Sequence, residues 1–213
     1  MEKILNNYAF IDASNLFYGG KKSLGWKIDY QKLFIYLQKK YNVSKVFYFG
    51  GVETYNFKFD YLNEEKIPID NLEKYIVDLI KERESEMTGA MILLLNKHLQ
   101  RIHFYLKLKD FGYNLFLKPI KSYEQEDGTI KRKANCDVDM TLQLMKEKEN
   151  FDSVIILSGD GDFLPVLKEL KNQEKRVIVL ARGPRTAKEV RQFAGSDFRD
   201  FEYLKYILKM SKG

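Results

Sequence analysis

The stretch VIILSGDGDFLPVLKEL, from Val154 to Leu170, decides the fold class. Four apolar residues typical of a buried strand run directly into a turn with two glycines and two aspartates, Ser158 to Asp162. A helical pattern of apolar residues begins at Phe163. Pro165 is compatible with the first turn of that helix, because the first N–H groups of a helix have no intrahelical partner. The segment therefore predicts a strand, a glycine turn and a helix.

Four further short runs resemble the strand at Val154–Leu157, because they are rich in β-branched and aromatic residues and nearly continuous in apolar character. Asp29 is expected to cap an intervening helix over Tyr30–Tyr41, and a second helix is expected to bury Val138, Leu142 and Met145. Strands that alternate with helices predict an α/β protein with a mainly parallel five-stranded sheet covered on both faces. The four runs are Tyr8–Ile11, Lys45–Phe49, Asn114–Leu117 and Val177–Leu180.

The connection between the second and third predicted strands is unusually long, at roughly 60 residues where a crossover needs about a dozen. One amphipathic helix is expected behind Asp70, and another through Leu95 and Leu106 that ends before Gly112. We therefore expect a single domain over residues 1–213 with a helical insertion at 55–88, which could serve as a lid or a dimer surface.

Composition limits the class of protein. The chain has 213 residues, of which 45% are hydrophobic and 31% charged, as in ordinary globular proteins. The amino terminus predicts no signal peptide, and no apolar run reaches the roughly 18 residues of a membrane span. Cys136 is the single cysteine, which excludes a disulfide framework and favours the cytoplasm. A net charge of +6 is compatible with a polyanionic partner.

Acidic residues follow two predicted strands and open one helix. Asp12 follows the first strand, Asp160 and Asp162 follow the fourth, and Asp137 and Asp139 open the helix between the third and fourth. Because ligands of open parallel sheets bind beyond the carboxyl ends of the strands, we expect all five carboxylates to converge there. Carboxylate oxygens without nearby Cys or His favour Mg²⁺ or Mn²⁺, so the five are candidate metal ligands and catalytic residues.

Each acid also has a structural interpretation. Asp162 is expected to be a helix N-cap, Asp137 or Asp139 could be a first-turn acid, and Asp12 could cap the turn after its strand. Five like charges close together would repel one another, however, unless a cation neutralised them.

Several motifs together resemble the NYN domain family, in its LabA-like branch, which belongs to the PIN-like metal-dependent nucleases. The resemblance implies a three-layer α/β fold with an Mg²⁺ or Mn²⁺ site made from Asp12, Asp137 or Asp139, Asp160 and Asp162. Asn15, Ser14 and Ser158 are the expected supporting residues. The motifs are FIDASNLFYGG (10–20), the basic stretch leading into CDVDM (136–140), ILSGDGDFLPVLKELKNQEKRVIVLA (156–181) and TAKEVRQFAGSDFRDF (186–201).

The chain departs from the family pattern in two ways. Gln143 stands where many relatives have a further acid, which weakens a second metal site, and the insertion has no recognised counterpart. The resemblance implies RNA as the substrate, with 5′-phosphate and 3′-hydroxyl products.

Basic and aromatic residues are candidate contacts to nucleic acid, although solvated surface charge and core packing are the alternatives. One basic group precedes the acidic helix, on the far arm of a hairpin predicted to turn at Asp127–Gly128, and another follows the fifth strand. Four aromatic residues alternate with polar ones in a segment expected to be extended. The basic residues are Lys131, Arg132, Lys133, Arg182, Arg185, Lys188 and Arg191, and the aromatic ones are Tyr55, Phe57, Phe59 and Tyr61.

The predicted function is a metal-dependent endoribonuclease, a hydrolase in which metal-activated water attacks a phosphodiester of single-stranded or structured RNA. The main alternative is an RNA-binding or scaffolding protein of the same fold with little or no turnover, and a homodimer is open. A phosphoaspartyl phosphatase is disfavoured because Ser14 stands where its second acid is required.

Overall fold

The computed structural model describes residues 6–14, 25–60, 62–125 and 127–210. The chain divides into two compact units. The first comprises Met1–Phe49, Gly112–Asn114 and Cys136–Gly213, and the second comprises Gly50–Phe111 and Leu115–Asn135. The segment 55–88 lies in the second unit, while its assignment as an insertion within a single domain stays a prediction.

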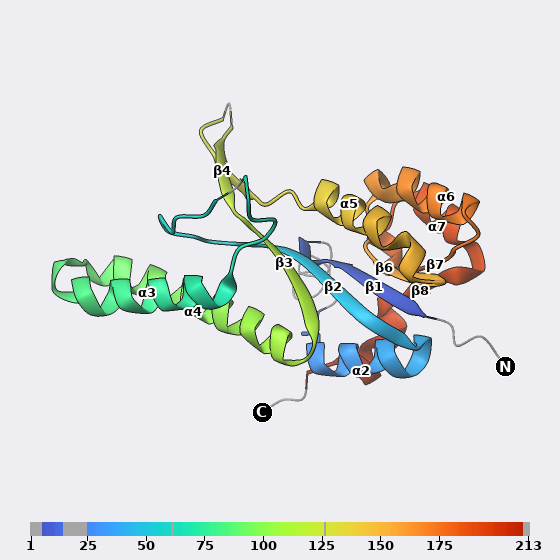
Figure 1. The fold of residues 1–213 in the computed structure, drawn as a ribbon, viewed down its shortest axis with the longest axis horizontal. Coiled ribbons are helices and arrows are strands. Elements are labelled where there is room, and N and C mark those ends of the chain that lie inside the picture. Colours follow the sequence, from blue (N-terminus) through green and yellow to red (C-terminus); the bar gives the residue numbers. More distant parts are fainter. Residues whose placement is uncertain (1–5, 15–24, 61, 126, 211–213) are drawn as a thin grey trace. The chain divides into compact units, whose positions relative to one another are not determined.

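The main sheet has six strands in the order β3-β2-β1-β6-β7-β8 (Figure 1). β1 pairs in parallel with β2 and β6, β7 lies parallel to β6, and β8 lies parallel to β7. The α/β fold with a parallel sheet is thus confirmed. The strands are β1 (Asn7–Asp12), β2 (Val43–Val52), β3 (Tyr113–Pro119), β6 (Ser153–Leu157), β7 (Arg176–Ala181) and β8 (Phe198–Asp200).

The prediction of five strands was wrong by one. β8 is three residues long, with the sequence Phe-Arg-Asp, and pairs Phe198 with Val179 and Asp200 with Ala181. Such a strand is too short to show an apolar run or an alternation, so nothing in its own sequence distinguishes it from a loop.

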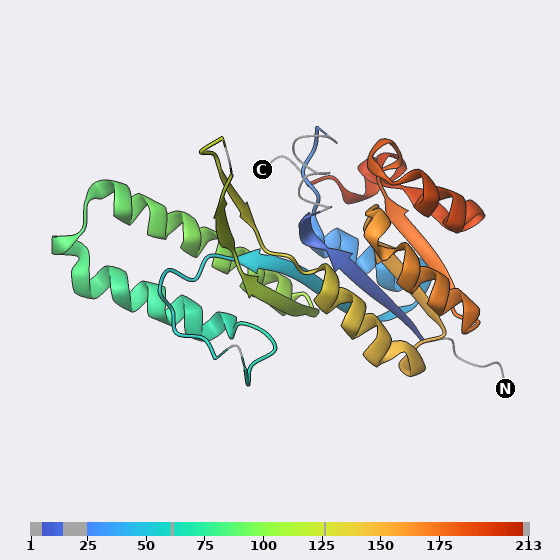
Figure 2. The same cartoon turned by 90° about the horizontal axis from the view of Figure 1, so that it is seen from above.

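Helices cover both faces of the sheet in the first unit. α5 (Asp137–Glu147) and α6 (Leu164–Asn172) lie on one face and α2 (Tyr30–Tyr41) lies on the other (Figures 1 and 2). α2 has the predicted bounds, and the Asp29 carboxylate accepts from the Lys32 N–H at 3.0 Å. Shorter helical segments complete this unit: η3 (Lys148–Asn150), η4 (Gly161–Phe163), η5 (Gly183–Arg185), α7 (Lys188–Ala194), η6 (Gly195–Asp197), η7 (Phe201–Leu204) and α8 (Lys205–Leu208).

The predicted buried face of α5 was wrong. Val138 and Leu142 are 73% and 53% exposed, whereas Met140 and Leu144 are fully buried. Both pairs are four residues apart and so fit a helical stripe, and the sequence alone does not say which stripe meets the sheet.

The second unit contains an antiparallel pair of helices, α3 (Ile69–Arg83) and α4 (Gly89–Asp110), joined by η2 (Glu84–Glu86) (Figure 2). The buried Tyr105 hydroxyl on α4 donates to the Gly51 carbonyl at 2.7 Å. β4 (Lys121–Glu124) and β5 (Ile130–Lys133) form an antiparallel hairpin. None of the helices in the described part of the chain is long and apolar enough to cross a membrane.

The aromatic residues near 55–61 do not form the predicted extended row. Tyr55 and Asn56 have φ values of 43° and 63°, so the chain turns there. The Phe57 ring packs against the Tyr75 ring of α3 with centroids 5.5 Å apart. Phe57 therefore has a packing role, and Tyr61 lies outside the described residues.

Candidate functional site

Asp12 is a buried carboxylate at the carboxyl end of the central strand β1, with 5% of its surface exposed. Its Oδ1 accepts hydrogen bonds from the Ser14 backbone N–H at 2.9 Å and the Ser14 hydroxyl at 2.6 Å. Its Oδ2 accepts from the Ser158 hydroxyl at 3.1 Å. These donors compensate part of the desolvation of a buried carboxylate and fix its orientation.

Ser158 connects the ends of two adjacent strands. It follows β6, is 2% exposed, and accepts a hydrogen bond from the Asp160 N–H at 3.2 Å besides donating to Asp12. β1 and β6 are paired in parallel register, Ile11 opposite Leu157, which brings both ends to one edge of the sheet. The predicted meeting of the first and fourth strands of the sequence at this edge is therefore observed, with Ser158 as the link.

The acid that caps the turn after β6 is not the one expected. Asp160, not Asp162, is the cap: its Oδ1 accepts from the Asp162 N–H at 3.0 Å at the start of η4. Asp162 is exposed, and α6 begins at Leu164 without a side-chain cap. Because η4 precedes α6, the cap lies one short helix earlier than the helical pattern indicated.

The loop after β7 packs tightly against this turn. The Ala187 N–H donates to the Gly159 carbonyl at 2.9 Å. A Cβ atom at Gly159 would lie 2.7 Å from the Thr186 hydroxyl, and one at Gly161 would lie 2.6 Å from a Glu189 carboxylate oxygen. Glu189 is thus a further acid beside the turn. Its position could not be predicted from the sequence, because Glu189 lies in the first turn of α7, where an acid is expected on helix-dipole grounds alone.

Asp137 and Asp139 lie in the first turn of α5, where they are half-buried. α5 contacts both β1 and η4, the elements that carry Asp12 and Asp162. Cys136, the residue before the helix, makes no side-chain cap. The helix dipole favours acids in this turn whether or not they bind a ligand.

The five acids do not form one compact set. Among the residues that the structure describes, no three His, Cys, Asp or Glu side chains are grouped closely enough to hold a metal ion. The chemistry of the donors still fits a hard cation, because Mg²⁺ keeps several waters and is bound by one or two carboxylates together with substrate phosphate. Asp12 and Asp160, linked through Ser158, are the pair that fits this description.

The basic residues after β7 flank the acidic turn. Arg182 is half-buried, and its Nε atom is buried without a hydrogen-bond partner in the described part of the chain. A buried donor of this kind is costly to leave unpaired, which makes it a candidate for an anionic ligand. The other members of this group, Arg185, Lys188 and Arg191, are exposed.

The other predicted contacts are less well placed. Lys131, Arg132 and Lys133 belong to β5 in the second unit, and their approach to the acids stays a prediction. Asn15 lies outside the described residues.

A family model described as "NYN domain" matches residues 95–202, just over half of the 213-residue chain. The matched segment includes α5, the turn after β6 and the loop after β7. The chain belongs to the NYN domain family. The family assignment made from the sequence motifs is thereby confirmed.

This NYN domain protein is similar to known proteins in sequence and in structure. The "Low amplitude and bright protein LabA" of Synechococcus elongatus is 26% identical over 86 residues, covering 39% of this chain and 46% of LabA. A crystal structure of a Vibrio parahaemolyticus protein of unknown function has a TM-score of 0.55 at 18% identity, covers 90% of each chain and shares the fold. The T5 D15 protein co-crystallised with metal ions has a TM-score of 0.44 at 16% identity and covers 87% of this chain and 59% of its own.

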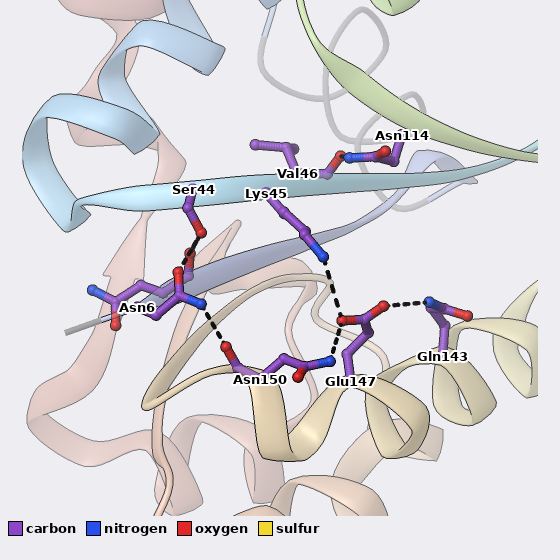
Figure 3. Close-up of polar contacts among 9 residues, drawn as sticks. Asn6, Ser44, Lys45, Val46, Asn114, Gln143, Glu147 and Asn150 are labelled. Atoms are coloured by element: carbon purple, nitrogen blue, oxygen red, sulfur yellow. Dashed lines mark hydrogen bonds and ion pairs between the residues drawn. The ribbon is translucent and has the colours of Figure 1, made fainter. Parts of the chain in front are cut away.

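Gln143, the position where an acid was expected, belongs to a different polar network in this NYN domain protein (Figure 3). Its Nε2 donates to Glu147 Oε1 at 3.2 Å, and Glu147 Oε2 accepts from Asn150 at 3.0 Å and lies 3.8 Å from Lys45 Nζ. Lys45 lies near the amino end of β2, where it is paired with Tyr8 of β1. Glu147 therefore joins α5 to the amino end of β2, and Gln143 contacts Glu147 within the helix.

Proposed function

We propose that this NYN domain protein is a metal-dependent ribonuclease that hydrolyses phosphodiester bonds at the acidic edge of its sheet. The observation that carries the proposal is the buried Asp12 carboxylate, which Ser158 links to the turn of Asp160 at the carboxyl ends of two parallel strands. Ligands of open parallel sheets bind at this edge. Membership of the NYN family supports the same reaction class.

The residues of the proposed site have different roles. Asp12 and Asp160 would hold Mg²⁺ or Mn²⁺, with Asp137 or Asp139 contributing through water. The metal, when bound, supplies charge stabilisation at the phosphate and a bound water of lowered pKa. Ser14 and Ser158 orient the Asp12 carboxylate through their hydroxyl groups.

The substrate would be held by positive charge beside the acids. Arg182 has the buried, unpaired Nε and is our first candidate for a phosphate contact, and Lys188 opens the helix that packs against the acidic turn. Lys and Arg contacts of this kind supply affinity that falls with salt concentration but carry no sequence information. The expected products carry 5′-phosphate and 3′-hydroxyl ends.

Cleavage of labelled RNA tests the proposal. The full chain is incubated with single-stranded and structured RNA, and with DNA of the same sequence, in Mg²⁺, Mn²⁺ or EDTA. We expect cleavage with either metal, none with EDTA, and at least a 100-fold loss in Asp12→Asn. The matched control is Glu149→Gln, which removes one charge from a side chain that is 78% exposed at the far end of α5. Equal fragments from the wild type and Asp12→Asn would mean a contaminating nuclease and would remove the support for this site.

A second measurement separates structural from ligand roles of the acids. Mn²⁺ should raise the melting temperature of the wild type and leave that of Asp12→Asn unchanged, since only the folded wild type binds the ion. The uncharged amide can still accept from Ser14, so we expect Asp12→Asn to fold without metal. If it does not fold, Asp12 is a structural cap rather than a ligand.

The alternative is an RNA-binding or scaffolding protein of the same fold. It is favoured by the absence, among the described residues, of a group of three ligands for one metal ion. Tight, salt-dependent RNA binding by the wild type without any turnover in Mg²⁺ or Mn²⁺ would establish it.

The expected setting is the cytoplasm, and a homodimer remains part of the proposal. Met91, Leu93 and Leu94 on α4 are exposed apolar side chains that a second copy could cover. Light scattering of the wild type and of Leu93→Lys tests this, and a monomeric wild type would contradict the dimer.

A further inference from the structure

The last helical segments of the chain are apolar on two sides. Phe201, Leu204 and Leu208 point inward and are at most 9% exposed. An outer set of four residues, which we call the C-terminal aromatic face, remains accessible: Tyr203 at 85%, Tyr206 at 98%, Ile207 at 50% and Met210 at 52%. Tyr203 lies in η7, Tyr206 and Ile207 lie in α8, and Met210 follows the end of α8. Large exposed apolar side chains that gather in one short segment mark an interaction surface.

Lysines lie within and beside the segment that carries the C-terminal aromatic face. The Lys32 ammonium donates to the Lys209 carbonyl at 3.0 Å, and the Met210 N–H donates to the Lys27 carbonyl at 2.9 Å. The nearby carboxylates are Glu202, next in sequence to Tyr203, Asp200, which caps η7, and Asp29, which caps α2 and lies 3.9 Å from Lys32. Positive charge is in excess by one, because the four lysines Lys27, Lys32, Lys205 and Lys209 stand against these three acids.

The face begins at the acidic edge of the sheet. β8 runs parallel to β7, so its last residue, Asp200, lies at the same edge as the carboxyl ends of β1 and β6. The Asp200 carboxylate accepts from the Glu202 N–H at 3.0 Å and so starts η7. Tyr203 therefore follows the edge of the candidate site by three residues.

We propose that the C-terminal aromatic face is a base-stacking platform for single-stranded nucleic acid. The proposal rests on the proposed function, in which the adjacent site acts on RNA. Stacking on aromatic rings together with lysine contacts to the backbone is how proteins bind single strands without sequence preference. A protein partner fits less well, because lysine is depleted at protein–protein interfaces, whereas Lys205 and Lys209 lie between the exposed residues of this segment in the sequence.

Tyr203 and Tyr206 carry the platform, and their removal tests it. Anisotropy of a fluorescein-labelled 12-nucleotide oligouridylate is measured in EDTA, which prevents metal-dependent cleavage. Stacking is worth enough that Tyr203→Ala/Tyr206→Ala should bind about 5- to 100-fold more weakly. Tyr203→Phe/Tyr206→Phe keeps both rings and should bind within twofold of the wild type, whereas Tyr203→Leu/Tyr206→Leu keeps apolar area and should bind as weakly as the alanine pair.

Salt dependence separates stacking from charge. The alanine pair should weaken binding by the same factor at every salt concentration. Lys209→Gln should instead reduce the slope of log affinity against log salt by about 0.7, the value for one phosphate contact on a single strand. All variants are exposed-site changes, and urea unfolding checks that each is folded.

Three results would overturn the platform. The first is an alanine double variant that binds RNA as tightly as the wild type, and the second is a leucine double variant that does so. The third is a wild-type dimer that becomes monomeric in the alanine double variant while RNA affinity stays constant, which would assign the face to a second copy. If RNA is cleaved and bound normally by the alanine pair, the platform fails and the proposed function stands. If the wild type neither binds nor cleaves nucleic acid, both fail.

Discussion

Gly159 lies at the closest approach between the two loops of the candidate site, and substituting it tests whether that packing positions the acids. An alanine Cβ there would lie 2.7 Å from the Thr186 hydroxyl oxygen and 2.9 Å from the Thr186 Cα. Thr186 cannot easily retreat. It is 5% exposed, its hydroxyl donates to the Arg182 carbonyl at 2.7 Å, and its N–H donates to the Gly183 carbonyl at 3.2 Å.

The expected cost of Gly159→Ala follows from these distances. Because the second clash is with backbone, a rotamer change does not relieve it, and the loops must separate by several tenths of an ångström. Overpacking of this kind costs about 1–3 kcal/mol. For a chain of this length, that lowers the melting temperature by about 3–10 °C. If the proposed nuclease site is correct, movement of the turn also displaces Asp160, and turnover should fall by up to about 100-fold, the loss expected for a misplacement of about 1 Å.

Urea unfolding followed by circular dichroism, together with the RNA cleavage assay, measures both effects. Gly89→Ala is the matched control, because a Cβ there has nothing within 4 Å and Gly89 is the first residue of α4. It should be neutral or stabilise by up to about 1 kcal/mol. Gly159→Ala/Thr186→Ala should show positive coupling, since Thr186→Ala removes the nearest atom. If the free energy of unfolding of Gly159→Ala lies within about 0.5 kcal/mol of the wild-type value, the two loops do not clash as described and the reasoning is refuted.

Three further substitutions probe other contacts. Ser158→Ala removes the donor to the buried Asp12 and should cost about 1–3 kcal/mol, measured by urea unfolding, with a drop in cleavage rate. Arg176 donates a hydrogen bond of 2.7 Å to Asp197 and lowers the pKa of that carboxyl group. The resulting stabilisation, at most about 1 kcal/mol, is present at neutral pH and is lost as pH falls through the lowered pKa. Asp197→Asn should therefore be less stable than the wild type to urea at neutral pH, and the difference between the two proteins should shrink in acid. Tyr105→Phe removes the bond to Gly51 and should cost about 1 kcal/mol, whereas an unchanged stability would mean that water replaces that bond.

The sequence predicted the parts of the fold that local chemistry determines. The helix at Tyr30–Tyr41 was predicted with its Asp29 cap, because an N-cap and a regular apolar stripe are both local signals. β8 was missed because its pairing with β7 depends on a partner about 20 residues earlier, Phe198 with Val179, and not on its own residues. The buried side of α5 was chosen wrongly because Val138 and Met140 both begin apolar stripes, and only the position of the sheet decides between them.

The candidate site, too, could be predicted from the sequence only in part. The apolar runs predicted parallel strands with acids at their carboxyl ends, whereas the direct pairing of β1 with β6, which brings Asp12 next to the turn of Ser158 and Asp160, came only from the structure. The sequence could not show that Asp160, and not Asp162, is the cap, because this depends on the single turn η4 that precedes α6. The Glu189 carboxylate lies beside the turn because the loop after β7 packs against Gly161, and nothing in the local sequence predicts that packing.

The hydrogen bonds of the acids explain how such a site can fold before it binds a cation. Repulsion among carboxylates is a cost of folding only to the extent that their charges lack compensation. Asp12 accepts from two serines, and Asp160 accepts from the N–H at the start of η4, so each charge is stabilised by donors of its own loops. If the proposed metal site is correct, the stability of the metal-free fold therefore rests on these hydrogen bonds and not on the cation. A capping role for a carboxylate is then compatible with a ligand role, because the hydrogen bonds of the cap fix the orientation that a ligand needs.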